Sequence, residues 1–357
     1  MTTRHALTLG LALTMLIIAG CTSNSNPVST TNPPPPPQGT ATTVIDSTGT
    51  YWIATVNATS YTTPAYYSFA KKDTVIPGGS DSLWDIGIER TEFKTNSGIS
   101  IDGGNVQGLA LTSTNFAAVT AADTVGKAWT TDAVAYFINN WYNYNINTHQ
   151  LTNNRNVYTM NDATGHHYIK FRIDSLLNPG IPPNMGTVYM TYYYNPTADS
   201  KALPGPTTQV VIPVGSNTVY FSFATGGVVT PAYPKSSTDW DLMFSNYNIG
   251  QNSGPNGPVG QAAAFYAFEF ITDPTNIDTV KDVYAGQAAA PLFPDAASTI
   301  FSNWYNYNES THILTSKNLV YMIKTEGKLY KIQIFSYYAN VAGSPVSADY
   351  IFYWKQL

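Results

Sequence analysis

The string Trp141-Tyr142-Asn143-Tyr144-Asn145 returns 163 residues later as Trp304-Tyr305-Asn306-Tyr307-Asn308. Each copy is followed, at the same distance, by the pattern Thr-His-x-Leu-Thr, which begins at Thr148 in one case and at Thr311 in the other. A match of this length, so rich in Trp and Tyr, indicates an internal duplication. Because the period is about the size of a domain, each copy is long enough to hold a core of its own.

Shorter blocks extend the repeat towards the amino terminus. Trp84-Asp85 matches Trp240-Asp241, and Asn96-Ser97-Gly98 matches Asn252-Ser253-Gly254. The Trp-Asp blocks predict a buried tryptophan at a strand entry, with a carboxylate that accepts hydrogen bonds from nearby backbone amides. The spacing between blocks changes slightly along the chain, as insertions in surface loops would produce. The sequence therefore predicts two successive copies of one fold.

The first residues have the features of a bacterial lipoprotein signal. A short polar start precedes an apolar run from Leu7 to Ile18, which is shorter than the roughly 20 residues of a membrane-spanning helix. We therefore expect residues 1–20 to be a removable signal peptide. The string Ile18-Ala19-Gly20-Cys21 resembles a lipobox, in which lipid is attached to the cysteine, and Cys21 is the only cysteine in the chain. The alternative is an ordinary secretory signal beside an incidental cysteine.

Residues 21–43 are predicted to form a tether. They are rich in Pro, Ser and Thr, and residues 33–37 are consecutive prolines, which favour stiff polyproline II structure. Thr22, rather than an acidic residue, follows the cysteine, and by resemblance to lipoprotein sorting this predicts the outer membrane. We expect a lipid-anchored protein at the outer membrane or cell surface, whose folded domains occupy residues 44–202 and 203–357.

The composition argues against nucleic-acid recognition, and the motifs argue against catalysis. Charged residues make up 11% of the chain and the net charge is −5, so nucleic acid is not an expected partner. A surface rich in Tyr, Asn and Thr suits sugars or flat aromatic ligands. The chain has no Gly-x-Ser-x-Gly or His-Glu-x-x-His motif, and its single cysteine is expected to carry lipid, so we predict no enzyme.

Residue alternation predicts an all-β fold. In Tyr330-Lys331-Ile332-Gln333-Ile334 and in Ile169-Lys170-Phe171-Arg172-Ile173, apolar residues alternate with polar ones, as in a strand with one buried and one wet face. Each string follows an apolar run and a short turn, which predicts a hairpin in each copy. Helices are expected to be short at most, with residues 132–140 and 295–303 as candidates capped by an aspartate. The fold class is therefore two tandem antiparallel β domains.

The second copy resembles the HmuY family of haem-binding surface lipoproteins. The resemblance extends over most of residues 207–353 and, more weakly, over residues 51–194, and so covers both tandem copies. It implies an all-β fold, haem capture outside the cell and transfer to an outer-membrane receptor. The motifs that carry it are Phe221-Ser222-Phe223-Ala224-Thr225-Gly226, Ser237-Thr238-Asp239-Trp240-Asp241-Leu242, Asn252-Ser253-Gly254 and the hairpin that ends in Tyr330-Lys331-Ile332-Gln333-Ile334.

In this family, two axial side chains, both His or both Met, hold the haem iron. Residues 265–301, the middle of the second copy, contain neither His nor Met, so the position of the first ligand is vacant there. His149 and His312 lie near the loop of the second ligand, which makes them the candidate ligands of haem iron. The alternative is that each histidine belongs to a turn into the next strand, while His166 and His167 are expected to project into solvent.

The aromatic residues beside the candidate histidines form the rest of the predicted site. They offer an aromatic platform for a porphyrin or a sugar. The alternative is that one face of this strand belongs to the core and the other is a tyrosine-rich surface. If the haem site has been lost, the chain is a structural, adhesive or carbohydrate-contacting surface module. The candidate haem-binding residues beside His149 and His312 are Trp141, Tyr142, Trp304 and Tyr305.

Overall fold

The computed structural model describes residues 39–357 except 78–82, 100–103, 149, 274 and 342. The signal peptide, Cys21 and most of the predicted tether lie outside the described residues, and so does His149. The described part consists of antiparallel strands and a few short 3-10 helices, which confirms the all-β prediction. These helices are η1 (Ala121–Thr124), η2 (Pro234–Ser236), η3 (Ala267–Glu269) and η4 (Ile277–Thr279).

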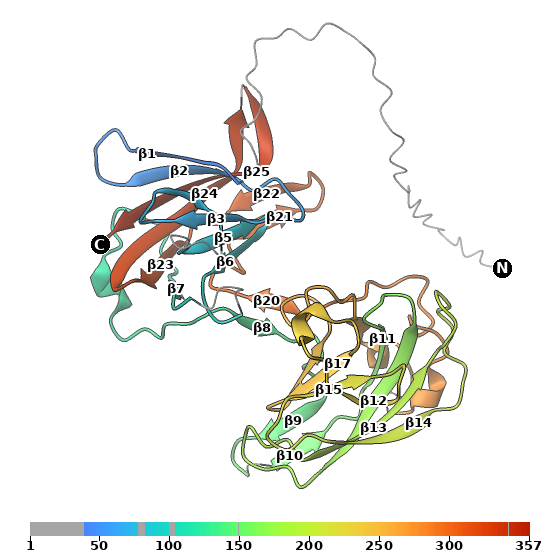
Figure 1. Ribbon diagram of the computed structural model, residues 1–357. Helices are drawn as coiled ribbons and strands as arrows, with labels where there is room; N and C mark the ends of the chain where they lie inside the picture. Colours follow the sequence, from blue (N-terminus) through green and yellow to red (C-terminus); the bar gives the residue numbers. More distant parts are fainter. Residues whose placement is uncertain (1–38, 78–82, 100–103, 149, 274, 342) are drawn as a thin grey trace, which may run out of the picture.

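Figure 1 shows two bodies, and the first, here named the terminal module, contains both ends of the described chain. Its strands are β1 (Ala41–Ile45), β2 (Trp52–Asn57), β3 (Ala65–Ser68), β4 (Asp73–Val75), β5 (Ile86–Glu89), β6 (Glu92–Thr95), β7 (Gln107–Ala110), β21 (Tyr305–Asn308), β22 (Ile313–Ser316), β23 (Val320–Thr325), β24 (Lys328–Val341) and β25 (Ser344–Gln356). A six-stranded sheet has the order β1-β2-β25-β24-β23-β7, and a four-stranded sheet has the order β4-β3-β5-β6. Both sheets contribute to one hydrophobic core.

The second body, the central module, is a contiguous part of the chain. Its strands are β9 (Tyr142–Asn145), β10 (Gln150–Asn153), β11 (Val157–Asn161), β12 (Tyr168–Leu177), β13 (Thr187–Tyr194), β14 (Thr208–Pro213), β15 (Val219–Ser222), β16 (Gly227–Val229), β17 (Leu242–Ser245), β18 (Asn248–Gln251) and β19 (Ala263–Phe265). The sheets have the orders β14-β13-β12-β11-β19 and β16-β15-β17-β18. The predicted hairpins are confirmed as β11–β12 here and β23–β24 in the terminal module.

The two modules do not coincide with the two sequence copies. Strand β2 of the first copy pairs with β25 of the second, and β11 of the first copy pairs with β19 of the second. Each core therefore combines the leading half of one copy with the trailing half of the other. Residues 44–202 and 203–357 were each expected to form one domain. This division is wrong for the packing, because each module takes its leading half from one copy and its trailing half from the other. In addition, β1 begins at Ala41, within the predicted tether.

The chain crosses between the modules twice, in β8 (Ala133–Ala135) and β20 (Ala296–Ser298), which pair with each other as an antiparallel ribbon (Figure 1). These strands occupy the segments for which short helices were predicted, so that prediction is wrong. The aspartates expected to cap the helices bind neighbouring strands instead. Asp132 accepts the amide of Thr95 at 2.6 Å, and Asp295 accepts the amide of Gln251 at 2.7 Å.

The outer face of each large sheet, predicted to be wet, is covered. Residues 111–130 lie over β23 and β24, and residues 267–271 and 277–292 lie over β11 and β12. A buried lysine holds each covering segment. Lys331 Nζ donates to the carbonyl of Val119 at 2.7 Å, and Lys170 Nζ donates to the carbonyl of Val280 at 2.8 Å. A buried ammonium needs such acceptors, which explains a lysine on a face that is not solvent-exposed.

The prediction for the Trp-Asp blocks is confirmed in both modules. Trp84 and Trp240 are almost completely buried. Asp85 accepts the amide of Phe69 at 2.7 Å, and Asp241 accepts the amide of Phe223 at 2.8 Å. Asp85 thereby fixes the end of β3, and Asp241 fixes the end of β15.

Candidate ligand-binding pockets

Each module has a pocket at the same place in the repeat. The pocket lies between a hairpin turn of the leading half (β5–β6 or β17–β18) and the chain that enters the repeated Trp-Tyr string of the trailing half. The cavity volume is about 220 Å³ in the terminal module and about 300 Å³ in the central module. Because the halves are exchanged, both sequence copies line each pocket.

Hydrogen bonds to the β5–β6 hairpin fix the wall of the terminal pocket that belongs to the second copy. Trp304 Nε1 donates to the carbonyl of Thr91 at 2.9 Å, and the Thr299 hydroxyl donates to the carbonyl of Phe93 at 2.8 Å. Trp304 is 2% exposed and also packs against the Phe93 ring, with ring centroids 5.9 Å apart. Trp304 is therefore a fixed base of the pocket, whereas the half-buried Tyr305 offers contact area.

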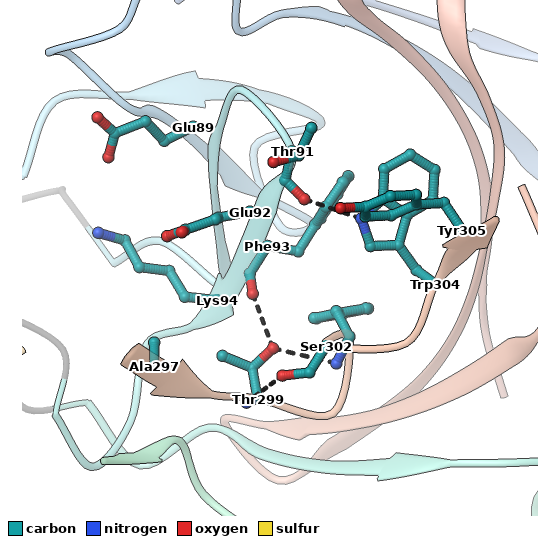
Figure 2. Close-up of a pocket in the computed structure, with 11 residues that line it drawn as sticks. Glu89, Thr91, Glu92, Phe93, Lys94, Ala297, Thr299, Ser302, Trp304 and Tyr305 are labelled. Atoms are coloured by element: carbon teal, nitrogen blue, oxygen red, sulfur yellow. Dashed lines mark hydrogen bonds between the residues drawn. The ribbon is translucent and has the colours of Figure 1, made fainter. Parts of the chain in front are cut away.

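The opposite wall of the terminal pocket is charged. Figure 2 shows Glu89, Glu92 and Lys94 on one side of the pocket, with Trp304 and Tyr305 on the other. Burial raises the pKa of Glu89, and the charge of Glu92 acts in the same direction, while that of Lys94 opposes it. This wall therefore combines two carboxyl groups, one ammonium group and an aromatic neighbour.

The central pocket has a different chemistry. Its walls carry Tyr136, Asn139, Tyr142, Tyr247 and Asn248, and no charged side chain is among the described residues that line it. The Tyr247 hydroxyl donates to the carbonyl of Gly180 at 2.7 Å, so this ring is held in place. Burial raises the pKa of Tyr136, so its hydroxyl remains protonated and able to donate at neutral pH. Phenol and amide groups of this kind recognise neutral polar ligands.

The structure places the predicted aromatic residues in the pockets but separates His312 from them. Trp304 and Tyr305 line the terminal pocket, and Trp141 and Tyr142 line the central one. His312 is exposed at the turn between β21 and β22, about three strand residues or roughly 10 Å from Tyr305. Its backbone is left-handed, with φ +57°, and its Nδ1 atom lies 2.6 Å from Tyr307 Oη.

The other described histidines and methionines are not among the residues that line the pockets. His166 Nδ1 pairs with Asp199 at 3.0 Å on the surface, and this hydrogen bond raises the His166 pKa. His167 Nδ1 lies 3.0 Å from Asp162. Four methionines are completely buried, and within the described ranges no histidine or methionine lines either pocket. These four are Met160, Met185, Met190 and Met322.

Sequence reasoning missed the leading-half walls of both pockets. Glu89, Glu92 and Lys94 stand between two repeated blocks, but their counterparts in the other copy differ: Asn248, for example, stands in place of Glu92. A search for shared residues therefore passes over them. One signal was available. The three residues lie between the Trp-Asp block and the Asn-Ser-Gly block, and the same two blocks enclose the equivalent hairpin in the other copy.

The structure is a two-module, all-β fold with one pocket in each module. The chain belongs to the HmuY family: the family profile, described as HmuY protein, matches residues 60–194 and 215–352. The two matches confirm the resemblance and its two tandem copies. No curated protein matches the chain. Across the described residues, no helix is long and apolar enough to span a membrane.

Proposed function

We propose that this protein is a cell-surface lipoprotein that binds a small extracellular ligand in the two equivalent pockets. The observation that carries the proposal is the recurrence of a pocket at one place in both modules, beside the repeated Trp-Tyr string. Concave sites with a few polar groups on an apolar base are typical of ligand binding.

Lipid attachment at Cys21 would place the pockets outside the cell, at the end of the Pro-rich tether. The lipobox-like string and the single cysteine support this placement. Cys21→Ala should move the protein from the membrane fraction to the soluble fraction. Unchanged lipid labelling and fractionation of that variant would remove the anchor from the proposal.

Haem is the ligand that the family resemblance implies, together with an outer-membrane receptor as partner. The described residues do not fit axial ligation at the pockets. His312 and the pocket lie at opposite ends of β21, and the fully buried methionines belong to the cores. His149 lies outside the described residues, and His312 belongs to the β21–β22 hairpin of the terminal module, away from the pocket.

A carbohydrate is the second candidate ligand, and the pocket walls favour it. The central pocket offers phenol and amide groups, and the terminal pocket offers carboxyl and hydroxyl groups beside Tyr305. Both cavities are at or below the lower end of the size range of ligand pockets, about 300 Å³. A sugar ring that contacts an aromatic side chain needs less enclosed volume than a porphyrin.

Titrations of residues 39–357 with haemin and with neutral oligosaccharides test the proposal. We expect saturable sugar binding by calorimetry, weakened at least tenfold by Tyr305→Ala or Tyr142→Ala. Tyr307→Ala, two residues along the same strand and outside the pocket, is the matched control. A low-spin haem spectrum that disappears in His149→Ala or His312→Ala would favour haem ligation instead. Failure of both ligand classes to bind would reject the pockets as sites.

A further inference from the structure

The two modules use the same contacts to join a leading half to a trailing half. In the terminal module, β7 pairs with β23 and Lys331 reaches the carbonyl of Val119. In the central module, β19 pairs with β11 and Lys170 reaches the carbonyl of Val280. These contacts between halves therefore recur at both joints. A trailing half has the contacts to pack on the leading half of its own copy.

The crossing ribbon is a feature that depends on the exchange. Strands β8 and β20 pair over three residues each, and this ladder joins segments that would not meet if each copy closed on itself. The hydrogen bonds of such a short ladder make a modest contribution to stability. Since equivalent contacts can join the halves in both arrangements, a difference of this size is enough to decide between them.

The crossing is also short and held at both ends. Asp132 is fixed in the terminal module by Thr95, and the amide of Phe137 donates to Asp295 in the central module at 2.9 Å. Only residues 133–136 lie between these anchors, and five extended steps span at most about 17 Å, which leaves the chain no room to turn back. A short hinge of this kind favours exchange over self-closure.

We propose that the β8–β20 ribbon is the hinge of an exchange between the two copies, and that a longer hinge lets each copy close on itself. The exchange also sets the composition of the pockets. In a self-closed first copy, the charged wall at Glu89, Glu92 and Lys94 would face Trp141 and Tyr142 instead of Trp304 and Tyr305. The two arrangements therefore present different binding sites from one sequence.

Cleavage between the copies distinguishes the two arrangements. A protease site placed after Thr197, in the exposed connection between β13 and β14, cuts the chain into one fragment per copy. In the exchanged arrangement the fragments share both cores, so the cleaved protein should elute as one particle of full mass. An insertion of about eight Gly and Ser residues in each crossing should give two folded particles of half the mass. The same insertion at Gly126, which is exposed and has open space around it, is the control.

Three results would overturn the proposal. One is separation of the fragments without any change to the hinge, which would mean that the copies are not exchanged in solution. Another is a chain with the lengthened hinge that is folded yet stays one particle after cleavage. Each leading half would then pair only with the trailing half of the other copy, whatever the length of the hinge. The last is loss of folding in the lengthened chain but not in the Gly126 control, because the ribbon would then be required for the fold itself.

An engineered cysteine pair gives a second readout that does not depend on the lengthened hinge. Thr55→Cys and Ile351→Cys face each other across β2 and β25, which belong to different copies. After oxidation and cleavage, the two fragments should remain linked on a non-reducing gel, and lengthening the hinge should abolish the link. The absence of a link with the unaltered hinge would also overturn the proposal.

Discussion

Gly98 and Gly254 occupy equivalent positions in the two copies, and both have left-handed backbone, with φ +55° and +53°. A Cβ atom at Gly98 would lie 1.9 Å from the carbonyl oxygen of Asp132, and one at Gly254 would lie 2.1 Å from that of Asp295. This close approach lets the turn after β6 contact the residue just before β8, and the turn after β18 contact the residue just before β20. Both glycines are therefore required by conformation and by space.

We expect Gly98→Ala and Gly254→Ala each to lower the free energy of unfolding by about 3 kcal/mol, the sum of a left-handed backbone cost and an overpacking cost. Urea denaturation followed by tryptophan fluorescence measures this change. Gly126→Ala separates the two causes, because Gly126 has φ +72° but no atom within 4 Å of an added Cβ. A loss at Gly98 no larger than that at Gly126 would contradict the steric part of the argument.

The sequence was informative where a short pattern occurs in both copies. The buried Trp84 and the amide-binding Asp85 were predicted correctly, because the pattern is local and occurs twice. For His312 the sequence allowed two interpretations, a ligand of haem iron or a residue of a turn. Its distance from the pocket depends on which way the β21–β22 hairpin extends, and local pattern does not determine that direction.

At the scale of single elements, buried carboxylates tie the strand ends together. Asp85 and Asp241 bind the amides that follow β3 and β15, and Asp132 and Asp295 bind β6 and β18 beside the crossings. Burial raises the pKa of Asp85, Asp132 and Asp241 to about 6, and it also raises that of Asp295. Backbone and side-chain hydrogen bonds oppose the shift without cancelling it.

These raised pKa values predict how stability depends on pH. The folded protein binds protons below about pH 6, whereas the same groups in the unfolded chain bind them only near the ordinary value of 3.8. Stability is therefore greatest at low pH within this window and is lost as the pH rises through 6. We expect the free energy of unfolding to fall between pH 5 and pH 7.5 by about 1 kcal/mol for each group.

Chemical denaturation at the two pH values measures this difference. Asp241→Asn should reduce the pH dependence by one group's share, whereas Asp239→Asn, at an exposed position two residues away, serves as the control. Equal stability at both pH values, or greater stability at pH 7.5, would show that the amide hydrogen bonds outweigh burial.

The wrong helix predictions belong to this scale as well. Residues 132–140 and 295–303 begin with an aspartate that suits a helix cap, but the aspartates bind Thr95 and Gln251, which lie far away in the sequence. The following residues then extend between the modules and pair with each other. Tertiary contacts decided these segments, and short-range propensity contained no information about them.

At the scale of the whole molecule, the duplication was readable but the pairing of its halves was not. The repeated blocks match in order, and residues 60–194 and 215–352 each match the family on their own. Equivalent residues offer equivalent contacts, as Lys170 and Lys331 illustrate. A sequence with two such copies is consistent with self-closed and exchanged arrangements alike, so only the three-dimensional structure distinguishes them.

The exchange predicts that residues 133–298 fold without the rest of the chain. All strands of the central sheets, and both of the central hydrophobic clusters, lie inside this segment, although it contains neither copy in full. We expect the isolated segment to unfold in one cooperative urea transition, because its core is complete and of ordinary domain size. Gly254→Ala should cost about the same 3 kcal/mol there as in the whole protein. A broad, non-cooperative transition would mean that the central module needs the terminal module, and the division into two independent cores would then be wrong.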